Sequence, residues 1–152
     1  MKKFELTSEF VTFLGKKLFR IKALVSFGDV KEGELGGLVE KEENLDQSGN
    51  AWVYGNARVY GDARVYGNAW VSGDARVQNC RDYSATSCFG SENRTTTFFR
   101  TKDGGISVRC GCFYGTLNEF REKVKERHGD SRLAKEYLML ADLMEFRLSK
   151  DE

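Results

Sequence analysis

The side chains with the most capacity for chemistry recur at regular intervals in the middle of the chain. No lysine occurs between Lys41 and Lys102, so every basic residue there is an arginine. Arginine offers a planar fork for a phosphate or carboxylate and a flat face for stacking. Tyrosine, tryptophan and arginine are also enriched in interaction hot spots. The pattern predicts a ligand- or partner-binding surface, and its candidate residues are Trp52, Arg58, Tyr60, Arg64, Tyr66, Trp70 and Arg76.

Two other interpretations of these residues stay open. They could be ladder side chains that cover the repeats, because cross-strand aromatic pairs stabilise sheets without any ligand. They could also lie between copies of the chain, because a short structure with apolar rings on its flanks gains by burying them.

Cysteine and histidine residues raise the question of a zinc site. Cys110 and Cys112 could join Cys80 and Cys88, or His128, around one metal ion. The single-residue spacing of Cys110 and Cys112 is not that of a usual zinc knuckle, and a strand would place both thiols on one face, where small buried thiols are ordinary. We therefore expect reduced cysteines, no bound metal and no cofactor.

The overall charge is close to balanced. Lysine and arginine total 24 against 23 acidic residues, a formal net charge of +1, which argues against a protein held on duplex nucleic acid by phosphate contacts. Glu5 and Glu9 stand where a signal peptide needs an apolar run, and no stretch is long enough to span a bilayer. We expect a cytoplasmic protein without a membrane partner.

The candidate residues are positioned by a six-residue repeat, in which each position forms a column down the sequence. Such self-similarity at a short period is typical of a solenoid. The columns are Gly49, Gly55, Gly61, Gly67 and Gly73; Asn50, Asn56, Asp62, Asn68 and Asp74; Ala51, Ala57, Ala63, Ala69 and Ala75; and Val53, Val59, Val65, Val71 and Val77.

The composition of the repeat predicts a chain that turns a corner every six residues. Glycine tolerates positive φ and Asn or Asp is the next best choice, whereas a helix or a long strand would be broken by these glycines. Followed backwards, the register places Val39 and Leu45 in the alanine column. We expect three segments: an N-terminal β segment over 1–36, repeats over 37–83 and a C-terminal part over 84–152.

The columns that hold Val53, Gly55, Asn56 and Ala57 resemble the hexapeptide repeat of left-handed parallel β-helices. Three repeats form one coil in that family, which implies about eighteen residues per coil, with Trp70 above Trp52. The resemblance also implies a homo-oligomer, with a trimer favoured. The motifs Tyr-Gly-Asn-Ala and Tyr-Gly-Asp-Ala are similar to those of small phage-encoded hexapeptide proteins of no assigned activity.

The family resemblance raises an enzymatic alternative. Many hexapeptide proteins are acyltransferases that use a histidine as general base, and related carbonic anhydrases bind zinc through three histidines. This chain has one histidine, His128, and none in the repeats. We expect a non-enzymatic binding protein, with an acyltransferase-like enzyme as the alternative. If the phage similarity holds, its partner is a host component in the host cytoplasm: a defence protein or its small nucleotide signal.

The flanking segments predict strands and helices. Residues 11–13 and 18–24 suggest two strands around a turn at 15–17, and residues 95–101 and 106–110 suggest a hairpin closed by 102–105. The fold class expected is mainly β: a short left-handed parallel β-helix with a β-rich N-terminal segment and a C-terminal ββαα cap that covers a coil end.

Two helices should complete the C-terminal part. Thr116 and Glu119 form a capping box that opens the first helix, and Gly129 closes it. Its apolar face is Leu117, Phe120 and Val124. A second helix should begin near residue 132, with an apolar stripe of Leu133, Tyr137, Leu140 and Met144.

Overall fold

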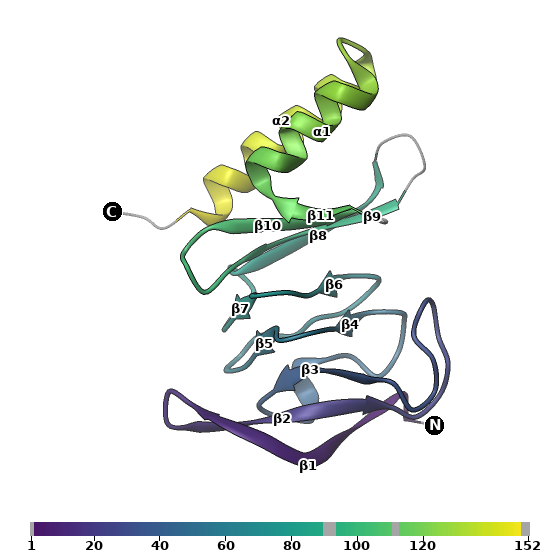
Figure 1. Cartoon of the computed structure of the whole chain (residues 1–152), viewed down its shortest axis with the longest axis vertical. Helices are drawn as coiled ribbons and strands as arrows, with labels where there is room; N and C mark the ends of the chain where they lie inside the picture. The colour runs from purple at the N-terminus through teal and green to yellow at the C-terminus, as the bar shows by residue number, and fades with distance from the viewer. Residues whose placement is uncertain (1, 90–93, 111–112, 150–152) are drawn as a thin grey trace. The chain divides into compact units, whose positions relative to one another are not determined.

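The structure is a computed structural model that describes residues 2–89, 94–110 and 113–149. The chain folds as two compact units, Met1–Cys80 and Arg81–Glu152, which are described separately (Figure 1). Within the described residues, no helix is long and apolar enough to cross a membrane.

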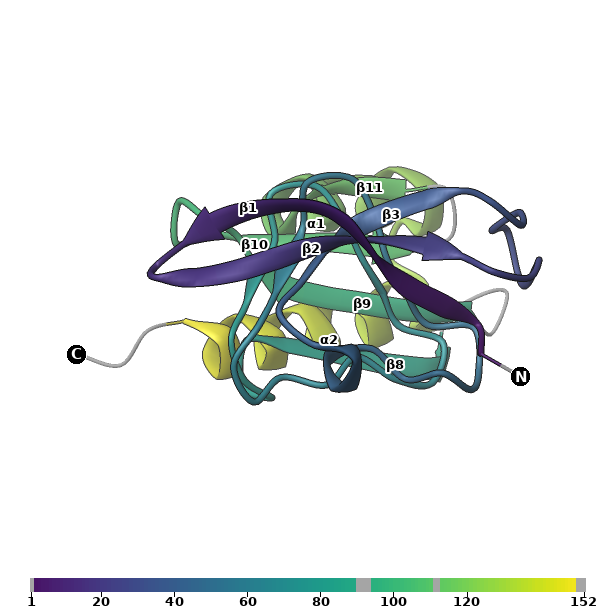
Figure 2. The same cartoon turned by 90° about the horizontal axis from the view of Figure 1, so that it is seen from below.

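The first unit begins with an antiparallel pair of strands, β1 (Phe4–Phe13) and β2 (Lys16–Ala23). The turn between them uses positive φ at Leu14 and Gly15. The two strands run side by side (Figure 2). Two strands were expected here, but β1 starts well before residue 11. In its early part Phe4 and Leu6 alternate with Glu5 and Thr7, and Phe4 is fully buried, so the alternation that marks a strand is present there and was missed.

The repeats add short parallel strands to this pair. The third strand, β3 (Leu35–Val39), joins β2 and is followed by a 3-10 turn at Glu42–Asn44. The strands that follow have two residues each: β4 (Trp52–Val53), β5 (Arg58–Val59), β6 (Trp70–Val71) and β7 (Arg76–Val77). One sheet has the order β1-β2-β3-β5-β7, and β4 pairs with β6 in another (Figure 1).

The register of these strands confirms the eighteen-residue stacking over most of the repeats. Trp52 pairs with Trp70 in β4 and β6, and Arg58 pairs with Arg76 in β5 and β7. Backbone bonds follow the same register, as in the bond from the Trp52 amide to the Ala69 carbonyl at 3.1 Å.

The register before residue 50 is different, and the prediction for Val39 and Leu45 was wrong. Val39 pairs with Val59, and Leu45 bridges to Val65, so both lie in the valine column and twenty residues separate each pair. The cause is the segment between Leu45 and Val53, which is two residues longer than a regular repeat. A fixed period extended backwards through that insertion assigns the wrong column.

Small side chains fill the interior of the repeats. Every alanine from Ala51 to Ala75 and every valine from Val53 to Val77 in the two columns is buried. The corner glycines take positive φ, as expected. Gly61 is also constrained by packing, since an added Cβ would lie 2.8 Å from the carbonyl oxygen of Gln78.

Asn44 fills the interior of the first coil and satisfies its backbone. The side chain is fully buried. Its Nδ2 donates to the carbonyl oxygens of Ala63 at 2.8 Å and Gly61 at 3.3 Å, while its Oδ1 accepts from the amides of Glu40 and Lys41. One amide side chain therefore links two successive coils.

The second unit is a four-stranded antiparallel sheet with two helices. Its strands are β8 (Tyr83–Phe89), β9 (Arg94–Arg100), β10 (Ile106–Cys110) and β11 (Phe113–Thr116), in the order β11-β10-β9-β8. The expected hairpin is β9 and β10. The expected ββαα composition was incomplete, because β8 is rich in small polar residues and β11 is short and contains a glycine, so neither gives a strong strand signal.

The helices agree with the sequence-based expectation. Helix α1 (Leu117–His128) begins with the Thr116 and Glu119 capping box and ends at Gly129. Helix α2 (Arg132–Leu148) is capped by Ser131. Leu133, expected on the apolar stripe, is only half-buried.

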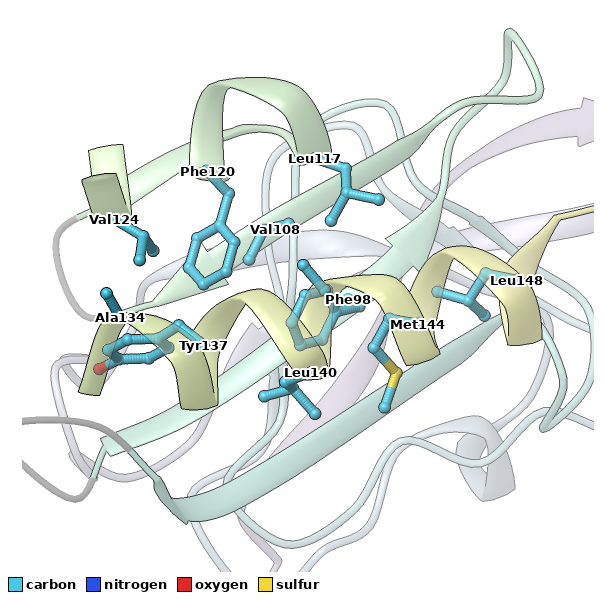
Figure 3. Close-up of a cluster of buried hydrophobic side chains, with 11 residues drawn as sticks. Phe98, Val108, Leu117, Phe120, Val124, Ala134, Tyr137, Leu140, Met144 and Leu148 are labelled. Atoms are coloured by element: carbon cyan, nitrogen blue, oxygen red, sulfur yellow. The ribbon is translucent and has the colours of Figure 1, made fainter. Parts of the chain in front are cut away.

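The core of the second unit is aromatic and aliphatic (Figure 3). Phe120 lies 5.8 Å from Phe98 and 5.8 Å from Tyr137, in both cases edge to face. The buried cluster comprises Phe98, Val108, Leu117, Phe120, Val124, Ala134, Tyr137, Leu140, Ala141, Met144 and Leu148.

Candidate interaction surface of the repeats

Trp52, the first of the predicted surface residues, is fully buried. Its ring meets Phe27 edge to face at 5.3 Å. Gly36 comes so close that an added Cβ would lie 2.7 Å from Trp52 Cζ2 and 2.7 Å from Ile21 Cγ1. The loop after β2 and the start of β3 therefore cover this tryptophan, and it belongs to the interior of the first unit.

Arg58 and Arg76 lie one coil apart and share an aromatic contact. The ring of Phe13, at the end of β1, lies 4.6 Å from the guanidinium carbon of Arg58 and 5.6 Å from that of Arg76. Phe13 also meets Tyr60 edge to face at 5.3 Å, and Tyr60 is buried. Arg76 Nη1 donates to the carbonyl oxygen of Ala75 at 2.9 Å. Arginine and tyrosine on this flank thus hold the first hairpin against the repeats.

Arg64 and Tyr66 lie on another flank and are more open. Arg64 Nη2 lies 3.4 Å from Asp46 Oδ1, and its side chain is largely exposed. Burial favours the neutral form of Asp46, but hydrogen bonds from Ser48 and Arg64 outweigh it and lower the pKa of this carboxyl group. Tyr66 is 58% exposed.

Trp70 contacts Tyr54, an exposed residue that was not among the predicted candidates. Its ring centroid lies 6.1 Å from that of Tyr54, which is 43% exposed. Tyr66 stands on the other side of the turn at Gly67, where the Ala69 amide donates to the Tyr66 carbonyl. We call Tyr54, Tyr66 and Trp70 the aromatic edge. Tyr54 could have been found from the sequence, since it shares a column with Tyr60 and Tyr66.

Lys3 is a further charged residue that the sequence did not single out. Its side chain is buried, and Nζ donates to the carbonyl oxygens of Ala51 at 2.7 Å and Gly49 at 3.4 Å. The ring of Phe27 lies 4.8 Å from the same nitrogen. Burial lowers the pKa of Lys3 to about 8, while the charge of Asp46 opposes that shift. Lys3 therefore satisfies carbonyl groups at the first corner of the repeats.

Of the residues that could support metal or acid–base chemistry, His128 and Cys110 have local partners, and Cys80 is exposed. The His128 ring is stacked on Tyr137 at 5.7 Å, at the end of α1. The Thr96 hydroxyl donates to Cys110 Sγ at 3.2 Å. Cys112 and the side chain of Cys88 lie outside the described residues. Among the described residues, no three His, Cys, Asp or Glu side chains are grouped as metal ligands would be.

Comparison with known families supports the repeat architecture. The family model described as the YdcK Beta solenoid repeat matches residues 51–67 and, in an overlapping window, residues 57–73. The matched stretch contains β4, β5 and β6. These residues are similar to a β-solenoid repeat, in agreement with the parallel pairing of the short strands. No match was found among curated proteins.

Proposed function

We propose that the protein is a non-enzymatic binding protein that assembles into a homo-oligomer through the aromatic edge. In this proposal the repeats form a left-handed β-solenoid, and the trimer is the favoured assembly. If the chain is phage-encoded, the assembled protein acts on a host component in the host cytoplasm. The aromatic edge carries this proposal, because Tyr54 and Tyr66 are 43% and 58% exposed and Trp70 contacts Tyr54.

The covered residues of the same columns are the reason to single out this edge. Trp52 shares a column with Trp70, and Tyr60 shares one with Tyr54 and Tyr66, but Trp52 and Tyr60 are buried against Phe27 and Phe13. Rings of this size provide large contact area, and they are favoured where one partner covers another. The N-terminal segment of the chain covers Trp52 and Tyr60, and a second copy of the chain could cover the exposed rings of the same columns in a similar way.

The arginine flank supports a host protein, rather than a nucleotide, as the partner. A phosphate-bearing ligand would use the guanidinium fork and its stacking plane. On Arg58 and Arg76 the aromatic contact is already made by Phe13, and Arg76 Nη1 donates to backbone carbonyls. A small nucleotide is therefore the alternative to a host protein, and it is tested below.

Self-association is tested with a double variant, Tyr54→Ser with Trp70→Ser. The expected result is a shift of the native mass towards monomer, with the circular dichroism of the parent retained. Tyr114→Ser is a suitable control, because Tyr114 is 45% exposed and lies in the second unit. A native mass that stays oligomeric in the double variant would show that the aromatic edge is not the interface.

Ligand class is tested by calorimetric titration with a panel of nucleotides. We expect no heat of binding to the parent protein. If a nucleotide does release heat with the parent, and this heat is lost in Arg58→Lys and Arg76→Lys with folding intact, the ligand is a nucleotide and not a protein. Lysine keeps the charge but lacks the fork. If no nucleotide binds, capture of a host protein by the parent assembly, and not by the Tyr54→Ser, Trp70→Ser variant, would identify the partner.

A further inference from the structure

Helix α2 carries an exposed apolar stripe in the second unit. Met139, Leu143 and Phe146 are 72%, 55% and 82% exposed. Their spacing of four and three residues places them on one ridge of the helix. The opposite face of α2 points its labelled side chains into the core (Figure 3). A surface helix ordinarily keeps that outer face polar, so three large apolar side chains in a row indicate a docking surface.

A hollow of about 540 Å³ opens beside this stripe, between α2 and the edge strand β8. The described residues that line it all belong to the second unit, and they are Arg81, Ser84, Leu143, Met144, Phe146 and Arg147. Two members of the stripe thus continue into a concave site, which an exposed helix face alone would not provide.

The charge of the hollow restricts its occupant. Arg81 and Arg147 contribute guanidinium groups to the lining, and among the described lining residues there is no carboxylate. The acidic residues nearby on α2 are engaged elsewhere, because Asp142 and Glu145 accept from Arg121 Nη2 at 2.8 Å and 2.7 Å. An apolar ridge beside two arginines is complementary to an apolar surface that carries carboxylates.

We infer that this surface of the second unit binds an amphipathic helix with acidic side chains, supplied by a partner protein. Apolar residues of the partner would pack on Met139, Leu143 and Phe146, as one helix packs its ridges into the grooves of another. Its carboxylates would meet Arg81 and Arg147. A second copy of this chain fits less well, because a symmetric contact places the same patch against itself and brings like charges together.

The experiment uses two synthetic helical peptides that share one apolar face. One carries glutamates beside leucines at i, i+4 and i+7, and the other carries lysines at the same places. Fluorescence anisotropy with the full chain should show binding of the glutamate peptide at least about tenfold tighter than that of the lysine peptide. Phe146→Ser should abolish binding of the glutamate peptide, and Arg147→Glu should reverse the preference between the two peptides.

Folding of the variants is checked by circular dichroism, and both altered side chains are exposed, so the fold should persist. Tyr114→Ser again serves as the control and should bind like the parent. Equal affinity for the two peptides, no binding of either, or binding that survives Phe146→Ser would overturn the inference. A native mass that falls in Phe146→Ser would overturn it in favour of a second copy as the occupant.

Discussion

The two units build their interiors from side chains of different size, and this difference determines how each responds to substitution. In the repeats, alanine and valine recur in the buried columns, and large rings such as Trp52 lie outside those columns under the N-terminal segment. In the second unit, Phe98, Phe120 and Tyr137 meet in one cluster. Enlarging a side chain should therefore be most damaging in the closely packed repeats, and truncating one should be most damaging in the second unit, where large rings make many apolar contacts.

The surfaces of the two units differ in a related way. The repeats present rings that recur with the sequence period, and the hairpin and the following loop cover part of them. Among the described residues of the second unit, the exposed apolar stripe on α2 is unrelated to any repeat. The partner that we propose for the first surface is argued from the repetition of its rings, and the partner proposed for the second is argued from charge and shape.

Truncation of the aromatic cluster should have the largest effect on stability. Phe98→Ala should lower the free energy of unfolding by about 3–5 kcal/mol, because it removes a fully buried ring that Phe120 contacts. Both tryptophans lie in the first unit and both helices in the second. Helical circular dichroism should therefore report a larger shift in midpoint than tryptophan fluorescence, and equal shifts would show that the units unfold together.

Overpacking of the repeats should have the next largest effect. Ala63→Leu should cost about 1–3 kcal/mol, because Ala63 is buried in a column that holds only small side chains. Tryptophan fluorescence during denaturant unfolding measures the change. Ala85→Leu is a control in the second unit, since Ala85 is exposed; it should leave the tryptophan transition unchanged and alter the free energy of unfolding by no more than about 0.5 kcal/mol. An Ala63→Leu midpoint equal to that of the parent would place the alanine column on the outside.

The repeats were predictable because the inward-facing alanine and valine columns keep the same buried environment through successive coils. The pairs Trp52 with Trp70 and Arg58 with Arg76 follow from the period alone. The prediction failed where the period fails, between Leu45 and Val53. In the second unit the capping box of α1 was visible, because it depends on residues three positions apart.

The burial of individual surface candidates could not be read from the sequence. Trp52 and Tyr60 look equivalent to Trp70 and Tyr66 in the sequence, but Phe27 contacts Trp52 and Phe13 contacts Tyr60. Those contacts join residues far apart in the chain, and neither phenylalanine belongs to a repeat. For the same reason, the burial of Lys3 against a corner carbonyl was not visible.

Lys3 gives the first unit a predicted pH dependence. Its pKa is about 8 in the folded protein, against an ordinary value of 10.5, so the unfolded chain binds more protons between these two values. The free energy of unfolding should therefore rise with pH from about 8 to about 10.5. Lys3→Met should lack this rise, so the difference in the free energy of unfolding between parent and variant, measured by tryptophan fluorescence, should increase over the same pH range. A difference that stays constant with pH would exclude a lowered pKa.

The smallest effect is expected at Arg64, and it separates the two arginine environments of the repeats. Arg64 forms a largely exposed ion pair with Asp46, so Arg64→Ala should cost at most about 1 kcal/mol, with a smaller cost at high salt. Arg58→Ala should cost more and should depend less on salt, because the Arg58 side chain packs beneath Phe13 and loses that contact. Chemical denaturation with urea at low and high salt measures both. If Arg64→Ala proves the more damaging of the two, then the exposed flank, and not the one beneath Phe13, holds the first unit together.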